Sequence, residues 1–137
     1  MQDRAARNAE IQARAAQEMA AMGVDAAFIN LLVDTFYNNI RNHPALGPIF
    51  AQKLDGHWDA HLLKMKSFWS AIAFKTGAYG GKPVQAHQGV NDLTPAHFPL
   101  WLALFSQTLD EVAPTPEAHA WFMTSAERIA RSLILAL

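Results

Sequence analysis

The spacing of apolar residues is the feature that most restricts the fold of this 137-residue chain. Apolar side chains recur at intervals of three and four residues, as they do along one face of an α-helix, and no stretch shows the alternation of a half-buried strand. The segment 26–42 carries the pattern at Phe28, Leu31, Leu32, Phe36 and Ile40. The sequence therefore predicts an all-α protein.

Start and stop signals divide the chain into helices. We expect five substantial helices and one short one, over residues 3–22, 26–42, 56–75, 95–112, 116–137 and, for the short one, 83–88. Asp25 and Asp55 are expected N-caps of the second and third helices, and Thr94-Pro95 and Thr115-Pro116 each join a capping residue to a proline suited to the first turn. Residues 46–50 are expected to form only a turn.

Composition and charge exclude several classes of function. Lys and Arg number 11 against 12 Asp and Glu, and no basic stripe is present, so binding to nucleic acid is not expected. The chain has no Cys, which excludes disulfides, iron–sulfur clusters and covalent c-type haem. No signal peptide or membrane span is evident. We expect a cytoplasmic monomer that makes no membrane contact.

Two histidines stand 26 residues apart, His61 in a predicted helix and His87 in a short segment between glycines. The chain turns back between them through a Gly-rich loop, so the two imidazoles could face each other across a gap. A porphyrin iron fits that arrangement, because one imidazole can bind the metal while the other faces the ligand of the metal.

Two alternatives to a porphyrin remain open from the residues. His57 and His61 have the i, i+4 spacing of a zinc half-site, although the segment lacks the Glu of the H-E-x-x-H motif and an obvious third ligand. The aromatic residues would otherwise form the core of a haem-free helical bundle that binds a protein partner.

The other candidate residues are either aromatic or lie within four residues of His61 in the sequence. Tyr37 lies at the edge of an apolar stripe, and Trp101 lies within one, where its indole N–H needs a partner if it is buried. Phe50 is either a hydrophobic plug or a surface for stacking on a flat ring. Met65 lies one helical turn after His61. Lys64 is either a solvated lysine or a contact to a haem propionate.

Taken together, segments between about residues 28 and 110 resemble the group III truncated (two-over-two) haemoglobins. They match, in order, that family's second helix and corner, its distal helix, its loop and proximal turn, and the helix after it. The matching motifs are Phe36-Tyr37…His43-Pro44…Gly47-Pro48-Ile49-Phe50, Trp58…His61-Leu62…Met65…Phe68-Trp69, Gly77…Tyr79…Pro83…His87 and Leu93-Thr94-Pro95…His97-Phe98…Trp101-Leu102…Phe105.

The resemblance implies a globin-like, two-over-two helical sandwich with a short proximal helix and haem b as the cofactor. It implies a single haem domain over residues 1–137, in which residues 1–22 form an N-terminal helical extension. The implied roles are iron ligation by His87, distal polar contacts by Tyr37, His61 and Trp101, packing on the porphyrin by Phe50, and lining of the ligand space by Met65.

The same resemblance implies reversible binding of oxygen, carbon monoxide and nitric oxide. A pocket with up to three hydrogen-bond donors, from Tyr37, His61 and Trp101, suits holding oxygen or a peroxide while electrons or nitric oxide react with it, so we also expect nitric oxide dioxygenase or peroxidase-like redox chemistry. The chain has no nucleotide-binding glycine motif, so sustained turnover would need an external reductase.

Overall fold

The computed structural model describes residues 4–76 and 94–136 of the chain. All regular structure in these two ranges is helical, which confirms the all-α prediction. The helices are α1 (Arg4–Ala21), α2 (Ala26–Arg41), α3 (Leu46–Leu54), α4 (Trp58–Phe74), α6 (His97–Val112) and α7 (Pro116–Ala136). The short helix expected over residues 83–88 lies outside the described residues.

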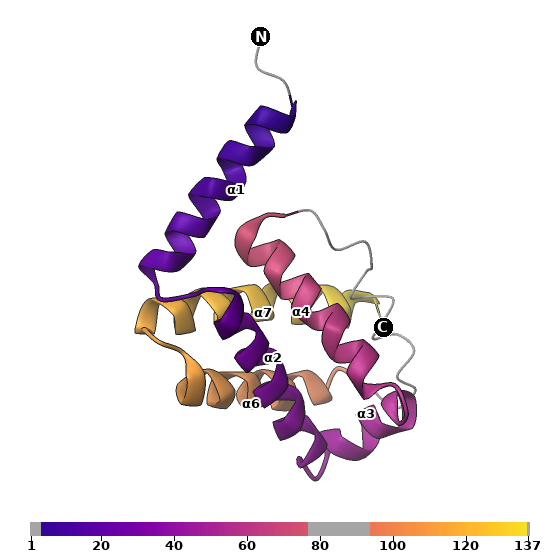
Figure 1. Cartoon of the computed structure of the whole chain (residues 1–137). Coiled ribbons are helices and arrows are strands. Elements are labelled where there is room, and N and C mark those ends of the chain that lie inside the picture. The colour runs from indigo at the N-terminus through magenta and orange to yellow at the C-terminus, as the bar shows by residue number, and fades with distance from the viewer. Residues whose placement is uncertain (1–3, 77–93, 137) are drawn as a thin grey trace.

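Two pairs of helices form a two-layered sandwich (Figure 1). Helices α2 and α4 pack side by side in front of α6 and α7, which also contact each other. The short helix α3 follows α2 at the lower end of the front layer and joins it to α4. This arrangement confirms the prediction of a globin-like sandwich.

Aromatic rings from all four helices meet between the layers. Phe105 of α6 stacks on both Trp101 and Trp69, at ring-centroid distances of 5.9 and 5.5 Å and interplanar angles of 6° and 13°. Phe36 of α2 meets Phe105 edge-on at 4.9 Å, and Phe122 of α7 lies 5.4 Å from Trp69. Each such pair adds about 0.5–1.5 kcal/mol beyond the burial of area, so this cluster is a main source of interlayer stability.

Two of the predicted N-caps are confirmed. Asp25 accepts a hydrogen bond from the Phe28 backbone N–H at 2.8 Å, at the start of α2. The Thr115 hydroxyl accepts from the Ala118 N–H at 3.1 Å and donates to the Met22 carbonyl at 2.8 Å. Thr115 therefore caps α7 and also ties it to the connection between α1 and α2.

The other two predicted caps are wrong. Asp55 follows α3, and its carboxylate accepts from the Trp58 indole N–H at 3.3 Å, while His57 occupies the N-cap position of α4 without a side-chain capping bond. Helix α6 begins at His97, with Ala96 at the N-cap position, and the Thr94 hydroxyl lies 3.1 Å from the His97 Nδ1 atom. A side chain that binds elsewhere is not available as a cap.

The turn expected over residues 46–50 is also wrong, because these residues belong to the nine-residue helix α3. Pro48 lies in its first turn, where a backbone N–H has no partner within the helix and proline is tolerated. The Nδ1 atom of His43 accepts from the N–H groups of Ala45 and Leu46, each at 3.1 Å, and so satisfies donors at the start of α3. Gly47 permits the tight corner, because a Cβ there would lie 2.7 Å from the Arg41 carbonyl oxygen.

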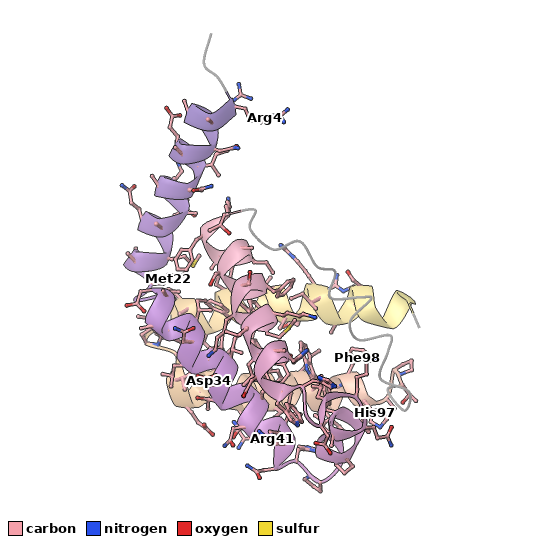
Figure 2. All side chains as sticks on the ribbon, turned by 45° about the vertical axis from the view of Figure 1, so that its right-hand side comes forward. Arg4, Met22, Asp34, Arg41, His97 and Phe98 are labelled. Carbon is pink, nitrogen blue, oxygen red and sulfur yellow. The ribbon has the colours of Figure 1, made fainter. Side chains whose placement is uncertain are left out.

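Helix α1 extends from the body of the molecule (Figure 2). Its residues 4–14 are exposed, and only Ala15 and Met19 are buried, at the end of the helix that contacts α4. Gly23 then takes a left-handed conformation (φ 82°) that ends the helix and lets the chain turn into α2. Among the described helices, no single one is long and apolar enough to cross a membrane. Helices α1 and α2 reach that length and apolar composition only when taken together, and the chain bends by 67° between them.

Candidate functional site

Tyr37 and His61 lie in contact between α2 and α4. Their ring centroids are 5.0 Å apart with an interplanar angle of 79°, which is an edge-to-face contact. Tyr37 is 3% exposed, and the Nε2 atom of His61 is shut off from solvent. Because Phe36 occupies the core-facing position of α2, the next side chain faces the neighbouring helix α4. The structure thus brings together two of the side chains predicted to be distal.

Trp101 of α6 joins the same group through Phe36. The Phe36 ring lies 5.3 Å from Tyr37 and 5.5 Å from Trp101, edge-on to both. Trp101 is 6% exposed, and its buried Nε1 has no hydrogen-bond partner among residues 4–76 and 94–136. A buried donor left without an acceptor costs about 1–3 kcal/mol. The unpartnered N–H is therefore an observation that points to a ligand.

Phe50 and Met65 are buried, as the prediction of an apolar wall requires. Phe50 is 1% exposed and comes from α3, while Met65 is 3% exposed and stands one turn after His61 on α4. Lys64 is exposed on α4, as expected of a solvated lysine. Its contact with a propionate stays a prediction, and so do the roles of Phe50 and Met65 toward a porphyrin.

His87 lies in the segment 77–93, outside the described residues, so its role as an iron ligand stays a prediction. The zinc alternative finds no further ligand in the part of the chain that is described. His57 is exposed at the start of α4, and no group of three or more His, Cys, Asp or Glu side chains in that part is placed to hold a metal ion.

One pair of polar residues near the site was not anticipated from the sequence. Thr108 of α6 is fully buried, and its hydroxyl accepts from the Asn39 Nδ2 at 3.0 Å and donates to the Leu104 carbonyl at 2.8 Å. The available signal was a threonine directly before Leu109 within an apolar stripe, where a hydroxyl needs a partner. Its partner lies 69 residues away, so local pattern alone did not identify it.

Comparisons with known proteins agree with this fold. No protein-family model matches the chain. The chain is 32% identical over 84 residues to the group 3 truncated haemoglobin ctb of Campylobacter jejuni, an alignment that covers 59% of this chain and 66%, just under two thirds, of that protein. The crystal structure of the group III truncated haemoglobin from Campylobacter jejuni matches with a TM-score of 0.76 and 28% identity, over 83% of this chain and 91% of that one.

The layered helices are those of a globin-type protein. Within that class, the chain is similar in both sequence and structure to the group III truncated haemoglobins.

Proposed function

We propose that this protein binds haem b and, with it, the diatomic gases oxygen, carbon monoxide and nitric oxide. We further propose His87 as the axial ligand of the iron. When bound, the haem would supply a coordination position for the gas and one-electron redox chemistry. Similarity to the group III truncated haemoglobins supports the cofactor. The described residues fit it, because Phe50 and Met65 belong to the same buried core as Trp101, whose N–H has no acceptor among the described residues.

That buried N–H, on Trp101, is the observation that carries the proposal. A diatomic ligand that draws negative charge is a hydrogen-bond acceptor small enough for a buried position. Preorganised donors stabilise such charge without reorganisation when the ligand arrives. Trp101 would thus hold the ligand, and the gas would satisfy an indole that is otherwise unpaired among the described residues.

Tyr37 and His61 would add two further donors from α2 and α4. At about 1 kcal/mol net for each hydrogen bond, three donors together would change the affinity for a polar ligand on the order of a hundredfold. Such differences fall mostly on the dissociation rate. Slow release suits a protein that holds oxygen or peroxide while an electron donor or nitric oxide reacts. We therefore propose nitric oxide dioxygenase or peroxidase-like chemistry, supported by an external reductase.

The absorption spectrum of the purified protein tests the proposal. We expect an intense Soret band that is lost in His87→Ala and kept in His119→Ala. His119 is a suitable control because it lies on α7, where it pairs with Asp110 at 2.9 Å on the surface between α6 and α7. A folded, colourless protein would instead favour the haem-free bundle, and stoichiometric zinc without haem would favour the zinc site. Either result would refute haem binding.

A further inference from the structure

The hydrogen bond between Asn39 and Thr108 connects α2 to α6 directly. These are the two helices that carry Tyr37 and Trp101. Asn39 follows Tyr37 by two residues, and Thr108 follows Trp101 by seven, which is two helical turns or about 10 Å along the axis. The polar contact therefore lies on the same pair of helices as Tyr37 and Trp101, two turns after Trp101 along α6.

The Thr108 hydroxyl is not required for packing. Valine has nearly the same shape, and a threonine hydroxyl can be satisfied by the carbonyl of its own helix, as Thr108 is by Leu104 at 2.8 Å. The additional bond from Asn39 at 3.0 Å uses a remaining lone pair of the buried oxygen. Because a hydrogen bond is directional, the Asn39–Thr108 bond forms only at one particular alignment of α2 against α6.

Aromatic packing alone restrains that alignment less. Phe36 meets Trp101 and Phe105 edge-on at 5.5 and 4.9 Å. Ring pairs of this kind are favourable over centroid distances of about 4.5–7 Å. A hydrogen bond between N–H and oxygen is favourable only over about 2.7–3.2 Å. A displacement of α6 by about 1 Å away from α2 would keep both ring contacts within their range, but it would stretch the Asn39–Thr108 bond from 3.0 Å to about 4 Å and break it.

We propose that Asn39 and Thr108 are positioning residues, which hold α6 against α2 at the alignment that places the Trp101 N–H and Tyr37 beside one ligand. The inference rests on the proposed function. A displacement of about 1 Å would take a donor out of hydrogen-bond range of the ligand, so the alignment of the helices controls ligand retention.

The test compares Thr108→Val and Asn39→Ala with two controls. Thr108→Ser keeps the hydroxyl, and Ser125→Ala removes a hydroxyl that bonds to the Trp121 carbonyl at 3.1 Å within α7. The readouts are the oxygen dissociation rate of the ferrous protein, the infrared stretching band of its carbon monoxide complex, and the urea midpoint of unfolding.

We expect Thr108→Val and Asn39→Ala each to speed oxygen release about three- to fivefold, as for the partial loss of one donor bond. Both should also shift or broaden the carbon monoxide band, which responds to donors beside the ligand. Thr108→Ser should stay within twofold of the wild-type rate. Ser125→Ala should leave both the rate and the band unchanged.

A second comparison asks whether the pair acts through Trp101. In a Trp101→Phe background, Thr108→Val should change the oxygen dissociation rate by less than about 1.5-fold, because residues that act through one another are not additive. The urea midpoints of the two single variants and the double variant Asn39→Ala/Thr108→Val should likewise be non-additive. If Thr108→Val fails to fold, Asn39→Ala at its half-buried position provides the same test.

Two results would overturn the inference while the proposed function stands. In one, the variants bind haem and lose stability, yet keep the wild-type rate and band, so that the pair is only structural. In the other, Thr108→Val has its full effect in the Trp101→Phe background. A wild-type protein without a Soret band would instead refute the proposed function, and the inference with it.

Discussion

Replacing Trp101 by phenylalanine removes the indole N–H and leaves an aromatic ring in place. Trp101 stacks on Phe105 at 5.9 Å with an angle of 6°, and Phe36 meets it edge-on at 5.5 Å. A phenyl ring can keep both contacts. The substitution therefore tests the donor with little change to the wall around it.

The size of the change in oxygen dissociation follows from the Trp101 Nε1 atom, which has no hydrogen-bond partner among the described residues. One hydrogen bond to a ligand is worth about 1–1.5 kcal/mol net, so its loss should speed oxygen dissociation about five- to tenfold. Stability should respond differently in the ferrous holoprotein without gas. In that state, the cavity left by the smaller phenylalanine ring lowers the free energy of unfolding by about 1–2 kcal/mol. Removal of a buried N–H donor that has no acceptor among the described residues raises the free energy of unfolding by about 1–3 kcal/mol, so the two effects nearly cancel.

Stopped-flow oxygen dissociation and urea unfolding measure the two quantities on one preparation. Trp121→Phe is the matched control, because Trp121 is a half-buried indole on α7, outside the described site, and its loss should leave oxygen release unchanged. A folded Trp101→Phe variant with a normal Soret band and a dissociation rate within twofold of wild type would refute Trp101 as a ligand donor.

Three further substitutions test other parts of the structure. Tyr37→Phe should speed oxygen dissociation about fivefold by stopped flow, because one donor bond of about 1 kcal/mol is lost, and a change below twofold would contradict a donor role. Asp25→Ala should lower the free energy of unfolding by about 1 kcal/mol through loss of the α2 cap, whereas Asp25→Asn should nearly preserve it, and equal urea midpoints for all three proteins would count against the cap. Gly47→Ala should destabilise by about 1–3 kcal/mol, since its Cβ would lie 2.7 Å from the Arg41 carbonyl oxygen, so an unchanged melting temperature would show that the corner is looser than described.

Local sequence signals predicted most of the helices because the interactions behind them are local. Asp25 and Thr115 cap the first turns of helices that begin one residue later, and Gly23 ends α1 through its own backbone conformation. The bounds of α1, α2 and α4 agree with the sequence prediction to within two residues at either end. Apolar periodicity identifies a helix wherever one face is buried, whatever it is buried against.

The prediction failed where a side chain takes a partner that its own segment does not reveal. The residues of α3 include Gly47 and Pro48, which suggest a turn, but the His43 imidazole and the buried apolar face of α3 make a helix there. Thr94 is not a cap, because its hydroxyl lies against the imidazole of His97. These errors concern competition between nearby partners, which spacing rules do not weigh.

Residue types and their order sufficed to predict Tyr37, His61 and Trp101 as site residues, since the motif spacing that resembles the family lies in the chain itself. Whether these residues meet in space depends on how distant helices pack. Tyr37 meets His61 only because α2 packs on α4, and Asn39 reaches Thr108 across 69 residues because α2 crosses α6. Helix formation depends on neighbours within about four residues, whereas the alignment of packed helices depends on contacts between distant segments. The candidate donors could thus be predicted from the sequence. The burial that leaves the Trp101 N–H without a partner among the described residues arises only from the packing of the helices.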